Sequence, residues 1–264
     1  MKNSIQKVVV LGAGNVATHL ALAMKEAGLQ IVQVYSRTQQ SAGVLARKLD
    51  CSFVTELDNL AQGADLYLLS VSDDVIENIA AQLPFKDALL VHTSGSTSLD
   101  ALNAAGSRTG VLYPLQTFSK NVPVRLSEVP LCLETRSRED MQLLDHLAST
   151  LSHSVFHIAS EKRRLLHVAA VFVCNFTNHM YTLGADLVNS GGLPFDMLRP
   201  LIAETARKAM NSSPQDLQTG PAIRQDQKTL QAHNELLHGL QDMQNLYNFV
   251  TQSIIHRHNP ANNK

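Results

Sequence analysis

Cysteine, net charge and long apolar runs are all scarce in this sequence of 264 residues. Its three cysteines, Cys51, Cys132 and Cys174, are far apart and odd in number, which excludes a disulfide framework and a metal knuckle. The net charge of −1 gives no general attraction to nucleic acid or to anionic membranes. No run of about twenty apolar residues is present, which argues against a membrane span. We therefore expect a protein of a reducing, cytoplasmic setting.

The first 158 residues alternate between short strand patterns and helical patterns. Continuous Val, Leu and Ile runs such as Lys7–Leu11 and Leu89–His92 are typical of strands covered on both faces. This alternation predicts an α/β fold, with a Rossmann-type, mostly parallel sheet and helices on both faces. The other predicted strands are Gln30–Tyr35, Ser52–Val54, Leu66–Val71, Thr109–Tyr113, Pro130–Glu134 and Ser154–Ile158, and helices are predicted over Val16–Ala27, Ser41–Leu49, Asp73–Gln82 and Arg138–Leu151.

The strand signal disappears beyond Ala159. Helical patterns extend from Glu161 to about Asn189, from Phe195 to about Asn211, and from about Ile223 to Ile255. Turn residues separate these three segments. We therefore expect two domains, an α/β domain over residues 1–158 and an all-α domain over residues 159–264.

The first predicted strand is followed directly by Gly12-Ala13-Gly14-Asn15-Val16-Ala17, which fits the Gly-x-Gly-x-x-Gly/Ala fingerprint. Gly12 permits the tight turn, Gly14 lets the backbone approach a pyrophosphate, and Ala17 allows close helix–strand packing. The helix that starts near Asn15 directs its free N–H groups at the phosphates. The context predicts dinucleotide binding by Gly12, Ala13, Gly14, Asn15 and Val16, with a plain strand–helix turn as the alternative.

The residues at the end of the second strand indicate whether the site binds NAD or NADP. An NAD-type site has an acidic residue there, but the sequence reads Ser36-Arg37-Thr38. The two hydroxyls can donate hydrogen bonds to a 2′-phosphate, and Arg37 can form a bidentate, charge-assisted pair with it. The turn therefore predicts NADP as the cofactor. The alternative for Arg37 is a solvated side chain in a surface turn.

Three further predicted strands end in polar residues, at the edge where open α/β sheets bind ligands. One end carries Ser70 and Ser72 around Val71, the next carries His92, Thr93 and Ser94, and the third carries the Tyr113–Phe118 turn. We expect Ser70 to Ser72 and Thr93 to contact the ribose and nicotinamide, and His92 and Ser94 to lie beside the nicotinamide. A buried histidine and a helix cap are the alternatives for the last two, and packing is the favoured role for Tyr113–Phe118.

The helical half carries isolated polar groups on a mostly apolar face. At about 100° per residue, Asn178 falls within about 20° of His167, and Asn175 within about 80°. Such groups are costly to bury unless a ligand or another helix satisfies them. Farther along, Gly220-Pro221 favours a helix start, and Arg224 follows it as a candidate for binding a substrate carboxylate or as a solvated residue. The other histidines have no carboxylate or cysteine at ligand spacing, so no metal site is predicted.

These segments together resemble a group of Rossmann-like NADP oxidoreductases with a C-terminal helical domain of unassigned function. The group is distantly similar to pyrroline-5-carboxylate reductase and ketopantoate reductase. The resemblance covers nearly the whole chain and also rests on Thr219-Gly220-Pro221, Asp226 and His233. It implies a homodimer formed through the helical domain and an active site between the domains. One departure is Gln225, because the group often has a glycine before the aspartate.

A second departure narrows the chemistry. Lys162 is followed four residues later by Leu166, so the Lys-x-x-x-Asn helix of β-hydroxyacid dehydrogenases is missing. We predict instead an oxidoreductase in which NADPH reduces a small imine or carbonyl compound. His92 or His167 donates the proton, while Ser94, Asn175 and Arg224 bind the substrate. The alternatives are a non-catalytic NADP sensor and, among enzymes, a pyrroline-carboxylate-type imine reductase.

Overall fold

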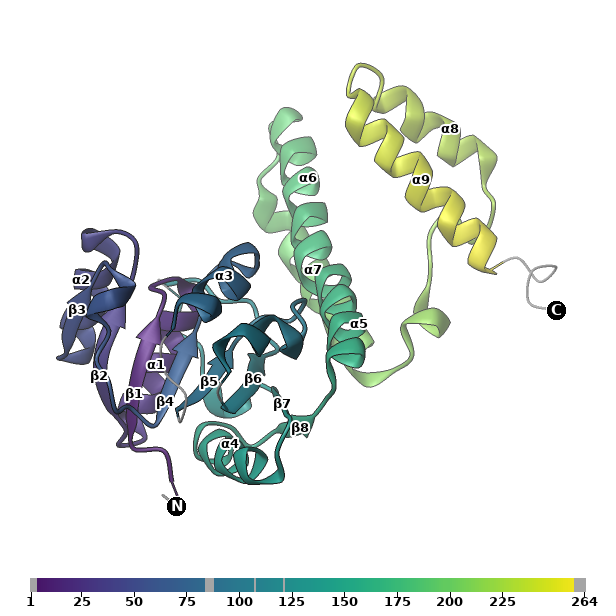
Figure 1. Ribbon diagram of the computed structural model, residues 1–264. Coiled ribbons are helices and arrows are strands. Elements are labelled where there is room, and N and C mark those ends of the chain that lie inside the picture. Colours follow the sequence, from purple (N-terminus) through teal and green to yellow (C-terminus); the bar gives the residue numbers. More distant parts are fainter. Residues whose placement is uncertain (1–3, 84–87, 107, 121, 259–264) are drawn as a thin grey trace. The chain divides into compact units, whose positions relative to one another are not determined.

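The computed structural model describes residues 4–83, 88–106, 108–120 and 122–258 (Figure 1). The chain divides into two compact units, Met1–Asn175 and Phe176–Lys264. Secondary structure changes from strands to helices at Ala159, after which helix α5 begins at Ser160. The predicted domain boundary at 158/159 stays a prediction. No helix in the described ranges has the length and apolar character needed to cross a membrane.

Within the described residues of the first unit, eight strands form one sheet in the order β3-β2-β1-β4-β5-β6-β7-β8. The strands are β1 (Lys7–Leu11), β2 (Gln30–Tyr35), β3 (Ser52–Val54), β4 (Leu66–Leu69), β5 (Leu89–His92), β6 (Arg108–Pro114), β7 (Leu131–Thr135) and β8 (Val155–His157). Neighbouring strands pair in parallel, except that β6 and β7 are antiparallel. The strand order reverses between β1 and β4, which is where doubly wound sheets bind ligands. The predicted mostly parallel α/β fold is confirmed.

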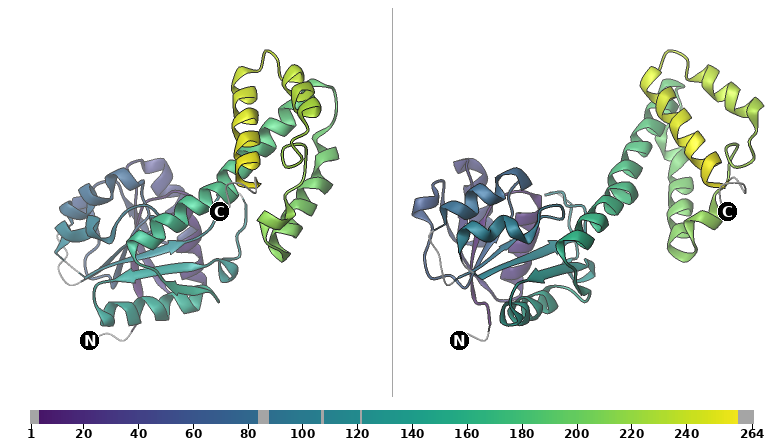
Figure 2. Two further views of the ribbon diagram at one scale, coloured as in Figure 1. Left: turned by 90° about the vertical axis from the view of Figure 1, so that its right-hand side faces the viewer. Right: turned by 45° about the vertical axis from the view of Figure 1, so that its right-hand side comes forward.

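Helices lie on both faces of this sheet (Figure 2). They are α1 (Asn15–Glu26), α2 (Gln39–Leu49), α3 (Ile76–Gln82) and α4 (Arg138–Leu151), with 3₁₀ segments at Leu57–Asn59, Asp73–Val75, Leu99–Ala105 and Leu126–Glu128. Val8 and Val10 of β1 pack in one core with residues of α1, α2 and α4, and Val9 packs in the other core with residues of α3. Alternate residues of one strand thus enter opposite cores.

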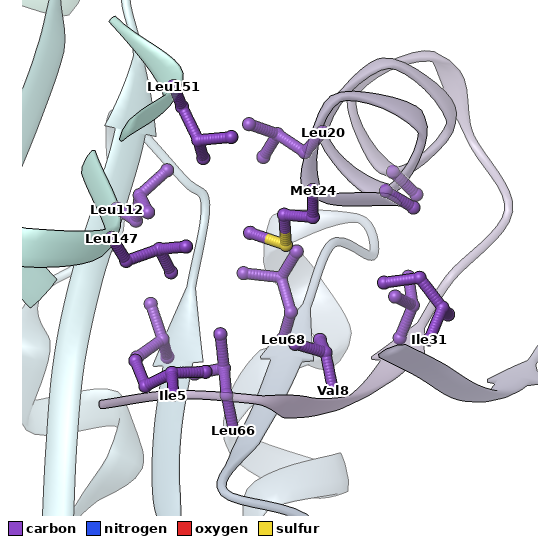
Figure 3. Packing of buried hydrophobic residues seen from close by; sticks show 14 of the residues in the cluster. Ile5, Val8, Leu20, Met24, Ile31, Leu66, Leu68, Leu112, Leu147 and Leu151 are labelled. Atoms are coloured by element: carbon purple, nitrogen blue, oxygen red, sulfur yellow. The ribbon is translucent and has the colours of Figure 1, made fainter. Parts of the chain in front are cut away.

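The core on the α1 side shows why the central strands are largely apolar (Figure 3). Met24 of α1 lies beside Leu68, and Leu20 of α1 extends toward Leu151 of α4. The strand residues Val8 and Leu68 are fully buried. Full burial of such a side chain stabilises the fold by about 1.5–3 kcal/mol. Polar side chains therefore gather mainly at the strand ends, and the buried Gln33 within β2 is satisfied by the backbone of Asn59 and Ala61.

Helices account for most of the chain after Ala159. They are α5 (Ser160–Ala170), a π-helical segment (Val171–Phe176), α6 (Thr177–Ser190), α7 (Arg199–Asn211), α8 (Gln227–Leu236) and α9 (Gln241–His258), with 3₁₀ segments at Phe195–Leu198 and Pro214–Leu217. The predicted single helix over Ile223–Ile255 is wrong. A turn at Gly239, which has a φ of 89°, separates α8 from α9, because glycine adopts this left-handed geometry readily and ends helices with it.

The π-helical segment corrects the predicted polar stripe. It lies between His167 and Asn178, and π-helical bonds span five residues instead of four. A constant 100° per residue therefore does not hold over this stretch, and Asn178 is rotated away from the position calculated for it. Asn175 and Asn178 are both exposed.

The family departure at Gln225 lies in a left-handed turn. Gln225 has a φ of 53°, a conformation that costs residues other than glycine roughly 1–2 kcal/mol. Its N–H donates to the carbonyl of Ala222, and the next N–H, of Asp226, donates to the carbonyl of Pro221. Asp226 then caps α8 through the N–H of Thr229. These hydrogen bonds therefore hold the left-handed turn even though its residue is glutamine and not glycine.

Candidate functional site

A cavity of about 940 Å³ lies along the carboxyl ends of the central strands in the first unit. Its lining includes every residue predicted to bind the dinucleotide. These are Gly12, Ala13, Gly14, Asn15 and Val16 after β1, Ser36, Arg37 and Thr38 after β2, Ser70, Val71 and Ser72 after β4, and Thr93 after β5. Its volume is at the upper end of ordinary ligand pockets. The fold thus brings the four strand ends to one site.

The turn after β1 leaves room for a phosphate. Gly12 has a φ of 118°, and a Cβ atom there would overlap the backbone carbonyl of Ser70 on the neighbouring strand. Gly14 is the N-cap residue of α1 and has no side chain to cap the helix, and a Cβ built on it meets no atom within 4 Å. A helix N-terminus left open in this way offers N–H groups and a positive dipole end to an anion. The turn therefore fits a pyrophosphate.

Two cationic side chains line the cavity, Arg37 after β2 and Lys120 after β6. Arg37 is exposed, and the neighbouring Thr38 accepts a hydrogen bond from the N–H of Ser41 while capping α2. The hydroxyl proton of Thr38 stays available to donate. Sequence reasoning missed Lys120, because its distance from Arg37 along the chain gives no sign that both reach one cavity.

A tyrosine–histidine pair forms another part of the cavity wall. The Oη atom of Tyr113, on β6, lies 3.1 Å from Nδ1 of His167, on α5. The two rings meet edge to face, with centroids 5.9 Å apart. A Cβ atom on Gly95 would lie 2.6 Å from Nδ1 of His167 and 2.7 Å from Cζ of Tyr113. The pair therefore depends on the absence of a side chain at Gly95.

The proton of Tyr113 is tightly held. Burial raises the pKa of its phenol to about 12, and the nearby thiol of Cys132 adds to the rise, while the Arg163 cation opposes it. Tyr113 therefore keeps its proton near neutral pH and can donate a hydrogen bond to His167. The predicted packing role of the Tyr113–Phe118 turn thus omitted a polar function for Tyr113. The signal was its phenol at a strand end, but its partner lies 54 residues away.

His92 does not line the cavity. Its side chain is fully buried, and Nδ1 accepts a hydrogen bond from the N–H of Ser94. Within the described parts of the chain, Nε2 has no hydrogen-bond partner. Burial, with a smaller effect of the Arg163 cation, lowers the pKa of the imidazole to about 4. This environment favours a neutral, buried histidine over a proton donor.

The other three catalytic candidates lie in different environments. The hydroxyl of Ser94 accepts hydrogen bonds from the N–H groups of Ser96 and Thr97 and donates to the Thr97 hydroxyl. Ser94 lines the cavity, but its hydroxyl stabilises the turn after β5. Asn175 is exposed in the π-helical segment and does not line the cavity, and Arg224 is exposed in the second unit. Their contacts with a substrate stay predictions.

Comparison with known proteins identifies the family. Residues 7–95 match the model described as NADP oxidoreductase, coenzyme F420-dependent, and residues 129–254 match a domain of unknown function, DUF2520. A crystal structure from Bacteroides fragilis, named as a "putative NADP oxidoreductase", is 44% identical, with a TM-score of 0.89 over 95% of this chain and 98% of that one. The chain belongs to this NADP oxidoreductase family. The predicted resemblance is confirmed.

More distant structures share the fold of this NADP oxidoreductase. An imine reductase from Myxococcus stipitatus in complex with NADP⁺ is 15% identical, with a TM-score of 0.65 over 94% of this chain and 91% of that one. A 1-pyrroline-5-carboxylate reductase from Streptococcus pyogenes is also 15% identical, with a TM-score of 0.63 over 96% and 99%. Such identities show a common fold alone. No curated protein matches the sequence.

The buried His92 predicts acid sensitivity. Its folded-state pKa of about 4 lies below the usual 6.5, so the unfolded chain binds a proton that the folded chain refuses. The free energy of unfolding should therefore fall as the pH drops from about 6.5 to 4, by roughly 3 kcal/mol at most. The His92→Asn variant keeps an acceptor for the Ser94 N–H and should lose less stability, as measured by chemical denaturation at several pH values.

The exposed His153 provides a matched control. The His153→Asn variant should retain the pH dependence of the unaltered protein. Parallel stability–pH curves for the unaltered protein and His92→Asn would contradict the assigned burial of a neutral imidazole.

Proposed function

We propose that this chain is an NADP-dependent reductase acting on the C=N or C=O bond of a small substrate. The observation that carries this proposal is the position of the Tyr113–His167 pair, on the wall of the same cavity that the glycine turn lines. The family supports the oxidoreductase class and an NADP(H) coenzyme. Bound NADPH supplies the hydride.

Different segments of the first unit bind different parts of the coenzyme. Gly12 to Val16 hold the pyrophosphate through backbone N–H groups at the start of α1. Ser36, Arg37 and Thr38 bind the 2′-phosphate, and Lys120 adds a second positive charge to the cavity. This division follows from the charge and the free donors that each segment turns toward the cavity.

His167 is the proton donor in this proposal, and Tyr113 fixes its ring. To act as the acid, His167 carries a proton on both ring nitrogens: Nδ1–H then donates to the Tyr113 oxygen, and release of the Nε2 proton to the substrate leaves a neutral imidazole. Addition of a hydride to a C=O bond leaves a negative oxygen, which a histidine can protonate near neutral pH. His92 is too deeply buried to reach a substrate in the cavity.

We also propose that the protein works as a homodimer through its second unit. Of the described residues in that unit, Ala222, Leu230, Leu237 and Thr251 are buried, whereas Met210, Leu236 and Phe249 are 77%, 80% and 75% exposed. A helical unit with so little core and so much exposed apolar surface is typical of an interaction surface. A second copy of this chain offers the same apolar faces, and closed pairs are the commonest assembly.

Coenzyme choice tests the role of Arg37. The Arg37→Ala variant loses a charge-assisted contact of about 1.5–3 kcal/mol, so its Kd for NADPH should rise by roughly 10- to 150-fold. Its Kd for NADH should change less than about twofold, since NADH has no 2′-phosphate. Arg47, also exposed but not lining this cavity, gives the control Arg47→Ala. Equal losses for the two coenzymes would contradict the assignment.

Turnover tests the Tyr113–His167 pair. NADPH oxidation with a panel of imines, keto acids and aldehydes should identify a substrate. Loss of His167 in His167→Ala should then lower kcat by roughly 10²- to 10⁴-fold, the usual contribution of a general acid. Tyr113→Phe should lower it less, and both variants should bind NADPH normally.

Tyr67, also in the first unit, provides a matched control, because its hydroxyl donates to the carbonyl of Ala61 at 2.7 Å and it does not line the cavity. Tyr67→Phe should leave kcat within about twofold of the unaltered value. Tight NADPH binding with no turnover across the panel would contradict a reductase and favour the alternative of an NADP sensor.

Light scattering tests the homodimer. The protein should show twice the 28.9 kDa mass of one chain. Phe249→Lys places a charge on the exposed apolar surface and should shift the equilibrium to monomer, whereas Asn248→Lys, at an exposed polar position, should leave the dimer intact. A mass of one chain for the unaltered protein at micromolar concentration would overturn this part of the proposal.

A further inference from the structure

Arg163 stands out because it is a fully buried cation. It is the largest fully buried side chain among the described residues, and it lies on α5 one helical turn before His167. Burial of an unpaired charge costs several kcal/mol, so a buried arginine is retained only where its partners are well placed. The partners of Arg163 show which elements it joins.

The guanidinium of Arg163 connects α5 to two strand ends. Nη1 donates to Oε2 of Glu134, on β7. Nη2 donates to the carbonyl of Thr97, in the turn after β5, and to the hydroxyl of Ser160. Nε has no partner among the residues that the structure describes. An arginine fork suits such a bridge, because a lysine presents a single point charge.

Glu134 also fixes the start of α5. Its Oε1 accepts the N–H of Ser160 at 3.0 Å, and its Oε2 accepts the Ser160 hydroxyl at 2.7 Å. The N-cap residue Ala159 makes no side-chain cap bond, so a carboxylate from another element caps the helix. The Ser160 hydroxyl in turn accepts the N–H of Leu99.

Ser160, Arg163 and His167 share one face of α5, because they are three and four residues apart. The first two are fixed to the ends of β5 and β7. The third meets Tyr113 on β6, which lies between those strands in the sheet. The attachment of the first two residues therefore decides where the imidazole of His167 stands.

We propose that Arg163 is a positioning residue for the Tyr113–His167 pair, which it holds together by fixing α5 to the ends of β5 and β7. This inference rests on the proposed function, in which that pair supplies the proton. Arg163 does not line the cavity, so it acts through His167 and not on a substrate directly.

The charge of Arg163 has a second effect on the pair. The pKa of Tyr113 is raised chiefly by burial and then by Cys132 on β7, with smaller contributions from Asp73 and Cys174, whereas the Arg163 cation lowers it. Arg163 thereby keeps the phenol more acidic than burial alone would leave it. The same cation lowers the pKa of His92, on β5.

The experiment observes the His167 ring by NMR in protein with ¹⁵N-labelled histidine, assigned with His167→Asn. Tyr113→Phe defines the spectrum of an imidazole without its phenol partner. Arg163→Met keeps the bulk of the side chain but removes its charge and fork, and it should shift the Nδ1 resonance as Tyr113→Phe does. The pKa of His92 should rise from about 4 in the same spectra. The control Arg164→Met, at an exposed neighbour, should match the unaltered protein.

An unchanged Nδ1 resonance in folded Arg163→Met overturns the inference. If that variant does not fold, Arg163→Lys decides, because it keeps the charge but cannot join Glu134 and Thr97 at once. A partial shift in the same direction supports the inference, and no shift overturns it. The measurement needs no turnover, so a chain that oxidises no NADPH contradicts the proposed function without changing this result.

Discussion

Burial of the central strands on both faces is the constraint on which the rest of the first unit depends. Residues Val8 to Leu11 and Leu66 to Leu69 are almost wholly inaccessible, because cores lie above and below them. A polar group within such a strand loses its hydration unless a partner replaces the water, as the carbonyl of Ala61 does for the Tyr67 hydroxyl. Polar chemistry is therefore displaced to the strand ends, and parallel strands place those ends along one edge. The cavity lies where this displacement concentrates donors, hydroxyls and cations.

The same constraint explains how much of the fold the sequence predicts. Lys7–Leu11 and Leu89–His92 were predicted with their observed bounds, since doubly covered strands are nearly continuous apolar runs. The bounds of Gln30–Tyr35 were also predicted, although Gln33 interrupts its apolar run. The antiparallel pairing of β6 and β7 has no such local signature, because pairing direction depends on the route of the chain between strands. The break at Gly239 was visible as a glycine, but the helical periodicity on both sides outweighed it.

The site divides in a similar way. The glycine turn and Ser36-Arg37-Thr38 could be found by reading along the chain, because each acts as a short contiguous segment beside a strand. The Tyr113–His167 pair could not, since its partners are 54 residues apart and its closeness depends on an atom that Gly95 lacks. Arg163 was missed because an arginine in an amphipathic helix is usually solvated. Only the arrangement of Glu134, Thr97 and Ser160 around it shows otherwise.

The left-handed Gln225 bears on how far this chain can diverge. A turn that retains glutamine where glycine would be unstrained holds an unused margin of stability. Most substitutions that reshape a binding cavity lower stability, and lineages tolerate them only while some margin remains. A glycine at this one position therefore offers a compensating change. The stability that this glycine adds would offset the loss caused by mutations that alter substrate preference.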